Sequence, residues 1–135
     1  MRIKRSVILA GLAGLLVVST SLLAHHGYAA YDMTATVTLK GTVTSFEMAN
    51  PHSSIAFDVK DASGTVVHWV VETGSPVRGM KAGGFTPETL KPGDQITITF
   101  NPGKDPDKHI GAFKNLELSD GRRLPVRQQG DPAGQ

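Results

Sequence analysis

The 135-residue sequence contains no cysteine. This absence excludes disulfide bonds, thiol catalysis, thiolate metal sites and a lipidated N-terminal cysteine. Aromatic residues are also few, at 6%, and include a single tryptophan. They leave little area for the substrate platform that an oxidative copper enzyme would need. The sequence also shows no long amphipathic helix and no internal repeat, so the stability of the fold must come from the packing of short elements.

The chain begins with the pattern of an export signal. A basic start precedes an apolar stretch from Val7 to Leu23, and Ala24 suits the position before a cleavage site. We therefore predict a signal peptide over residues 1–24 and a protein that is periplasmic or secreted. Leu22 is larger than the residue usual three positions before the cut, so cleavage after Ala29 is an alternative. An uncleaved membrane anchor is another, because the apolar stretch approaches the ~20 residues that span a bilayer.

The charge balance changes once the leader is removed. The leader holds three of the 14 basic residues and none of the 12 acidic ones, so the 111 residues after position 24 carry 11 basic and 12 acidic residues. A nearly neutral chain lacks the basic surface that nucleic acids require, and we expect no nucleic-acid partner. Its length is enough for one domain with one modest core.

From residue 37 onward, short β-branched runs alternate with glycine, proline, asparagine and aspartate, which is typical of an all-β domain. Gly41 within the first run predicts a bulge or a sharp bend. Asp61 to Gly64 predicts a hairpin turn between the second and third strands. The predicted strands are residues 37–48, 54–60, 66–72, 95–100 and 110–118, with a short sixth strand around Leu124 and Val126.

Residues 73–94 lose the alternation and form a long connection. Within it, Thr86 to Leu90 predicts a short helix, with Thr86 as the N-cap and Pro87 at the first helical position. Strands in this order, with a bent first strand, favour a five- to six-stranded OB-like Greek-key barrel with a short helix between strands three and four. The alternative is a small β-sandwich. The predicted division is a signal peptide (1–24), an N-terminal arm (25–36), a β-barrel domain (37–127) and a disordered tail (128–135).

Six short segments carry a resemblance beyond the fold class. They are His25 to Tyr28, Gly41 to Val43, Asn50 to Ser53, Trp69 to Pro76, Leu90 to Asp94 and the Asp120–Gly121 turn. In this order they resemble the uncharacterised secreted bacterial family known as domain of unknown function 6152. The resemblance implies an exported protein and brings no established activity. Similar proteins often have tryptophan at the positions of Met48 and Ser54, so this chain lacks aromatic surface there.

Two adjacent histidines would stand at the start of the mature chain. If cleavage follows Ala24, the α-amine and the imidazole of His25 can chelate one metal ion, and His26 adds a second imidazole. A third ligand from elsewhere would complete the arrangement known as a histidine brace. If processing stops before Ala24, His26 becomes the third residue of a square-planar copper or nickel chelate. Both arrangements favour copper, and the alternative is a solvated terminus without metal.

Three further histidines are candidate metal ligands. His52 follows Asn50-Pro51 in a tight turn, where it either binds a metal or donates a hydrogen bond to a turn carbonyl. His68 is four residues from Glu72 on one strand face, so the two form a ligand with its supporting carboxylate or belong to an exposed cross-strand pair. His109 ends an Asp-x-Asp-x-His pattern, which is a weak metal signal because it lacks the later glutamate of a calcium loop. Plain turn chemistry is favoured there.

We find no catalytic pattern. Gly74-Ser75 lacks the nucleophile elbow, no glycine-rich stretch precedes a helix, and no pair of carboxylates is placed across a cleft. The first hypothesis is a periplasmic binding module that holds or passes copper through His25 with help from His52, His68 or His109. The second is a metal-free module that binds a small ligand or another exported or envelope protein. An oxidative copper enzyme is the least favoured, and the sequence leaves the oligomeric state open.

Overall fold

The computed structural model describes residues 28–75 and 77–125. The predicted signal peptide, the His25–His26 pair and the tail from residue 128 lie outside the described residues. None of the helices in the described part of the chain is long and apolar enough to cross a membrane.

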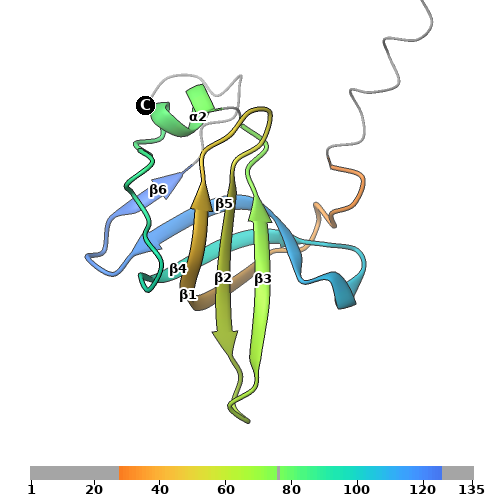
Figure 1. Ribbon diagram of the computed structural model, residues 1–135. Helices are drawn as coiled ribbons and strands as arrows, with labels where there is room; N and C mark the ends of the chain where they lie inside the picture. The colour runs from red at the N-terminus through yellow and green to blue at the C-terminus, as the bar shows by residue number, and fades with distance from the viewer. Residues whose placement is uncertain (1–27, 76, 126–135) are drawn as a thin grey trace, which may run out of the picture.

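The fold is a closed five-stranded β-barrel with one added strand (Figure 1). The strands pair in the order β3-β2-β1-β4-β5-β6, and β3 also pairs with β5 in parallel, which closes the ring. This order confirms the OB-like Greek-key barrel and excludes the β-sandwich. The strands are β1 (Val37–Glu47), β2 (Ser54–Lys60), β3 (Val66–Glu72), β4 (Gln95–Pro102), β5 (Ile110–Leu118) and β6 (Arg123–Pro125).

The first strand bends so that it serves both halves of the barrel. Its first half pairs with β4 and its second half pairs with β2, and the register shifts between Val43 and Ser45. At the bend, a Cβ on Gly41 would lie 2.7 Å from both the backbone oxygen of Asp58 and the ring of Phe57. The sequence therefore needs glycine at this position because the two strands approach too closely for a side chain.

The helix between strands three and four is α2 (Val77–Ala82), so the prediction of a helix at residues 86–90 is wrong. The side chain of Asn50 accepts a hydrogen bond from the backbone N–H of Val77 at 3.0 Å and so satisfies one free donor at the start of α2. The helix ends where Gly84 takes a positive φ of 92° and Phe85 N–H returns to the carbonyl of Met80. Both Met80 and Phe85 are buried.

Residues 86–90 form a turn because the side chain of Thr89 competes with helix formation. The hydroxyl of Thr89 accepts a hydrogen bond from the backbone N–H of Thr86 at 2.7 Å, and the N–H of Thr89 donates to the Thr86 carbonyl at 3.0 Å. Such local bonds favour turns over helices. Pro92 follows within three residues, which leaves no room for a second helical turn.

The core fills the barrel between its two ends. Phe57 lies edge-on to Phe100 with 6.4 Å between ring centroids, and the ring of Trp69, the cross-strand partner of Phe57, lies 5.2 Å from Phe100. The fully buried side chains include Phe57, Phe85, Phe100, Ile55, Met80, Ile98, Leu116, Val43 and Val71. These residues come from β1 to β5 and from the connection that contains α2, so the connection covers one end of the barrel.

The arm before β1 is packed against the barrel. Tyr31 forms a β-bridge with Gly103, and the N–H of Asp32 donates to the carbonyl of Pro102 at 2.8 Å. The buried side-chain amide of Asn101 donates to the carbonyls of Met33 and Ala35. These bonds fix the path of the arm and place its first described residue, Tyr28, against the end of β3.

Candidate functional site

The loop between β1 and β2 is anchored by a buried set of hydroxyl groups. Ser53 and Thr73 are fully buried, and the N–H of Thr73 donates to the carbonyl of Ser53 at 2.8 Å. The Thr73 hydroxyl accepts from the N–H of Ser53 at 3.3 Å, while the Ser53 hydroxyl accepts from the N–H of Ala49 at 3.2 Å. Fully satisfied polar groups of this kind rigidify a loop. They hold the cis Asn50–Pro51 turn, and His52 with it, against the end of β3.

The hydrogen bond of His52 sets which of its ring nitrogens is free. Its Nδ1 lies 3.3 Å from the carbonyl oxygen of Thr73. A carbonyl can only accept, so Nδ1 carries the proton and donates, and Nε2 of the neutral ring keeps its lone pair. Histidine ligands of metals are commonly held in this way, with one ring N–H bonded to a backbone carbonyl. The structure thus shows a hydrogen bond from His52 to a carbonyl, but the acceptor belongs to Thr73, 21 positions away, and not to a turn. The bond leaves the ring able to bind a metal.

A tyrosine–glutamate pair lies next to His52. The hydroxyl of Tyr31 donates a hydrogen bond to Oε2 of Glu72 at 3.1 Å. The Tyr31 side chain is only 7% exposed, whereas Glu72 is exposed to solvent. The buried phenol therefore fixes one carboxylate oxygen of Glu72, while the other oxygen remains available.

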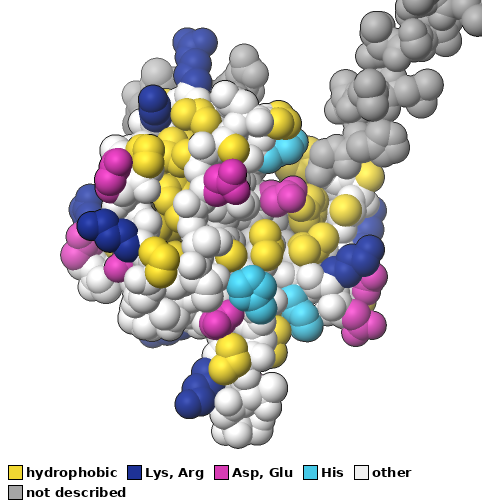
Figure 2. Space-filling model, viewed as in Figure 1, with side chains coloured by type: hydrophobic (Ala, Val, Ile, Leu, Met, Phe, Trp, Pro, Cys, Tyr) yellow, Lys and Arg dark blue, Asp and Glu magenta, His cyan; other side chains and the backbone are white. Residues whose placement is uncertain are grey.

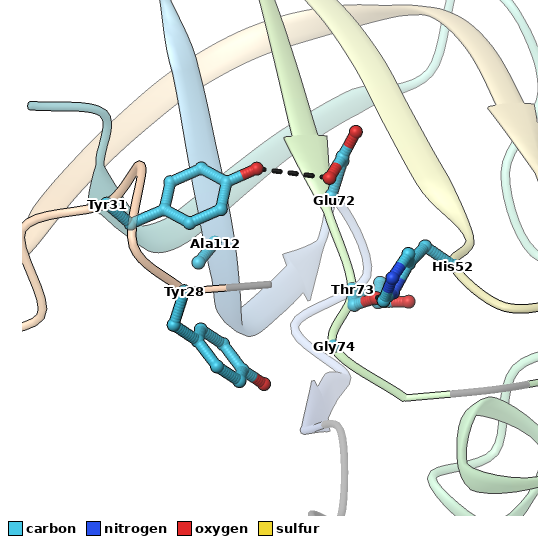
Figure 3. Close-up of a pocket in the computed structure, with 7 residues that line it drawn as sticks. All are labelled: Tyr28, Tyr31, His52, Glu72, Thr73, Gly74 and Ala112. Atoms are coloured by element: carbon cyan, nitrogen blue, oxygen red, sulfur yellow. Dashed lines mark hydrogen bonds between the residues drawn. The ribbon is translucent and has the colours of Figure 1, made fainter. Parts of the chain in front are cut away.

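These side chains line one small pocket (Figure 3). Tyr28 and Tyr31 come from the arm on one side, and His52 and Glu72 come from the β1–β2 loop and the end of β3 on the other; Thr73, Gly74 and Ala112 complete the lining. The cavity volume is about 40 Å³. This is room for a few water molecules or one coordinated ion, and far less than the several hundred Å³ of an organic substrate pocket.

Gly74 allows the arm to reach this pocket. A Cβ at position 74 would collide with the hydroxyl of Tyr28. Glycine therefore gives the tyrosine ring the space to lie against the end of β3. Three of the segments that carry the family resemblance, around Tyr28, His52 and Gly74, meet here.

Tyr31 should ionise at a much higher pH than an ordinary tyrosine. Burial, and then the charge of Glu72 and the hydrogen bond to it, raise the pKa of Tyr31 from 10.0 to about 12. Below pH 10, the ordinary pKa of tyrosine, Tyr31 stays protonated and its full contribution to the stability of the fold is present. That contribution is lost as the pH rises through about 12, where Tyr31 ionises in the folded protein. We expect a tyrosinate absorbance titration with a step near pH 12 that Tyr31→Phe removes. A step that persists in the variant would contradict this assignment.

His68 lies outside the pocket and has a different partner. Its Nδ1 is 2.7 Å from Oδ1 of Asp58, its cross-strand neighbour, and the His68 side chain is 57% exposed. The expected cross-strand pair is thus confirmed, with Asp58 as the partner of His68 in place of Glu72. Figure 2 shows histidine side chains both at the upper end of this face and toward its lower end.

His109 belongs to a turn. Asp105 caps the short 3-10 helix η2 (Pro106–Lys108) by accepting from the N–H of Asp107 at 3.1 Å, and His109 ends it with a positive φ of 41°. The ring of His109 packs against Trp69 with 5.1 Å between centroids. Turn chemistry therefore accounts for the Asp-x-Asp-x-His spacing, as the sequence favours.

The five candidate histidines thus fall into three groups by position. His52 lies at the pocket, His68 and His109 lie outside it, and His25 and His26 lie outside the described residues. Within residues 28–75 and 77–125, no three side chains of histidine, aspartate or glutamate form a group that could hold a metal ion. Sequence reasoning missed Tyr28 and Tyr31 as site residues and paired Glu72 with His68. The only signal for them was their presence in or beside the segments that carry the family resemblance.

Comparisons with known proteins give distant structural neighbours and a family. No curated protein matches the chain. Among solved structures, the mitochondrial single-stranded DNA binding protein Rim1 from S. cerevisiae is 8% identical, with a TM-score of 0.47 over 63% of this chain and 94% of that chain. The ZRD-deleted mutant of TiaS, solved in complex with agmatine, is 14% identical, with a TM-score of 0.44 over 74% of this chain and 24% of that chain.

The family comparison covers most of the sequence. The model of a family of unknown function, DUF6152, matches residues 12–112. This range includes five of the six segments on which the resemblance was based. The chain therefore belongs to the DUF6152 family.

Proposed function

We propose that the mature protein is an exported, periplasmic copper-binding module that holds or passes Cu(II). In this proposal the α-amine and imidazole of His25 supply two ligands, and Nε2 of His52 supplies the third. The protein carries the ion and catalyses no reaction.

One observation carries the proposal: Tyr28 lines the same pocket as His52. His26 and His25 stand two and three positions before Tyr28 in the chain. An extended backbone covers at most about 3.6 Å per residue, so the Cα atoms of His26 and His25 are tied to within about 7 Å and about 11 Å of the Cα of Tyr28. A chain of this length is therefore compatible with a ligand set that His25 and His52 share.

The chemistry of the pocket supports an ion as the ligand. The hydrogen bond to Thr73 leaves Nε2 of His52 with a free lone pair. An amine and imidazoles are nitrogen ligands that suit Cu(II), and the cysteine-free chain offers no thiolate to favour Cu(I). The small cavity agrees with this choice, because its volume of about 40 Å³ is far below that of a typical pocket for an organic ligand.

His68 and His109 are less suitable third ligands. His68 pairs with Asp58 and His109 packs on Trp69, and neither residue lines the pocket that contains Tyr28. Replacing His52 should therefore weaken copper binding, whereas replacing His68 or His109 should not.

We expect His52→Ala to weaken Cu(II) binding by more than about 100-fold, because loss of a ligand exceeds the 10–100-fold effect of losing a group that only supports one. His68→Ala is the matched control and should bind copper as the wild type does. The measurement is a stoichiometric Cu(II) titration of protein that starts at His25, followed by electron paramagnetic resonance. If the wild type binds no copper under these conditions, the copper function is wrong and a metal-free binding module replaces it.

A further inference from the structure

One edge of the barrel is open along the first half of β3. Strand β5 pairs with β3 only at Val70, Val71 and Glu72. His109 takes a positive φ of 41° directly before β5, so the chain enters β5 from the η2 turn and not along β3. Residues 66–69 therefore pair with β2 on one side and, within residues 28–75 and 77–125, with no strand on the other. Figure 1 shows this part of the β2–β3 hairpin extending beyond the barrel.

The hydrogen bonds of β3 show which backbone groups face the open edge. The N–H of Thr73 donates at 2.8 Å to the carbonyl that directly precedes β2, whereas the N–H of Val70 donates in the opposite direction, to the carbonyl of His109 at 3.1 Å. Residues of an antiparallel strand alternate between bonding to their partner strand and facing away from it. The odd-numbered residues of β3 therefore bond to β2, and the backbone groups of Val66 and His68 point to the open edge.

This edge lacks the features that protect β6, the last strand on the other side of the sheet. Strand β6 has three residues, among them Arg123 and Pro125. Short length, charge and proline are the usual means by which an edge avoids pairing with another chain. The open segment of β3 contains neither lysine nor proline, and its pairing with β2 has no bulge. Val66 is 56% exposed, the highest value among the large hydrophobic side chains of the described residues. Such an edge is suited to pairing with a further strand.

We infer that residues 64–68 form an interface with a second copy of the protein, in which the two β3 strands pair antiparallel about a twofold axis at Val66. In this register Val66 exchanges both backbone bonds with Val66 of the partner subunit, and His68 lies opposite Gly64 of the partner subunit. The two exposed valines cover each other. The same strand edge serves both subunits, so the contact is closed and stops at a dimer.

The charges near the edge are compatible with this pairing. On β2, Lys60 is the register partner of Val66, and Asp58 is that of His68. The Lys60 residues of the two subunits would stand three strand spacings apart, or roughly 14 Å. This exceeds the Debye length of about 8 Å at physiological ionic strength, so the two charges are largely screened. The candidate copper pocket is lined by Glu72 at the far end of β3. The interface therefore goes beyond the copper function and does not depend on it.

Sedimentation equilibrium of protein that starts at His25, with a chelator present to exclude bridging metal, tests the inference. The contact is short, so we expect a reversible dimer with a dissociation constant between about 10 µM and about 1 mM. Val66→Pro removes an N–H that faces away from β2, so the ladder with β2 is retained, and it should weaken the dimer by at least about tenfold.

Two lysine variants provide a second test that keeps every backbone N–H. Val66→Lys places like charges opposite each other on the twofold axis and should also weaken the dimer. Met33→Lys is the matched control, because it makes the same change in charge at a 48% exposed hydrophobic residue outside β3. It should leave the dissociation constant unchanged. Circular dichroism checks that all variants keep the fold of the wild type.

Amide hydrogen exchange measured by NMR identifies the surface. The N–H groups of Val66 and His68 should exchange more slowly in concentrated than in dilute protein, whereas those of Val67 and Trp69, which face β2, should be protected in both. A protein that remains monomeric up to about 1 mM would overturn the inference and leave the edge to a strand of a different protein. A dimer that Met33→Lys weakens, or that leaves Val66 and His68 unprotected, would place the interface elsewhere and overturn it as well.

Discussion

A mature chain that starts at Gly27 is expected to bind Cu(II) more than about 100-fold more weakly than one that starts at His25. The shorter chain loses the imidazoles of His25 and His26, so its α-amine, now on Gly27, has no imidazole on the same residue with which to chelate, and His52 is the one proposed imidazole ligand that remains. Ligand loss should exceed the 10–100-fold effect that follows from removing a supporting group. Isothermal titration calorimetry with a competing ligand measures the difference, and equal affinities for the two chains would contradict the proposal.

A chain that starts at Ala24 provides the sharper control. Its third residue is His26, so its amine, two backbone nitrogens and the His26 imidazole can form a square-planar copper chelate without the pocket. We expect this chain to bind copper as well, but His52→Ala should not change its affinity. The copper affinity should depend on His52 in the chain that starts at His25 and should not depend on it in the chain that starts at Ala24. This pair of results would show that cleavage directly after Ala24 creates the site.

Phe57→Ala is expected to destabilise the fold by about 3–5 kcal/mol, the usual cost of truncating a fully buried phenylalanine. Phe57 is 0% exposed, packs edge-on to Phe100 and lies against the bend at Gly41. The variant therefore leaves a cavity where β1 passes from one half of the barrel to the other. Urea unfolding followed by circular dichroism measures the loss in free energy of unfolding.

Phe46→Ala is the matched control for this prediction. Phe46 lies on the same bent strand and contacts Phe85 with 6.1 Å between centroids, but its side chain is only partly buried. It should cost clearly less than Phe57→Ala. Equal losses for the two variants would mean that the bend is no more tightly packed than the periphery of the core.

Much of the barrel could be predicted from local pattern. The alternation around Phe57 and Trp69 defines β2 and β3 to the residue, because one face of each strand is buried and the side-chain period is two. Gly41 marks the bend for a steric reason that is visible in the sequence. The helix was misplaced because its N-terminus is satisfied by Asn50, which is 27 residues away in the chain. A cap supplied by tertiary structure leaves no local signal.

The candidate site could be predicted only in part. The sequence singles out His52 because a proline turn fixes its backbone, but the turn gives no sign that the acceptor of its hydrogen bond is the carbonyl of Thr73, 21 positions away. Tyr31 and Glu72 could not be paired from the sequence, since 41 positions separate them and their contact depends on how the arm crosses the hairpin between β4 and β5. Parity placed Glu72 and His68 on one face, but cross-strand register gave His68 to Asp58.

The position of the pocket also bears on the order of folding. Glu72 and Ala112 both line the pocket, and they are a register pair in the parallel β3–β5 pairing that closes the barrel. Pairing of strands so distant in sequence is slow, because the loop-closure entropy is lost before the contacts form. The full pocket, which joins residue 28 to residue 112, therefore cannot exist in a partly assembled barrel. A chain that acquires its ligand in this pocket does so as one of the last events of its maturation, so bound ligand would mark molecules that have finished folding.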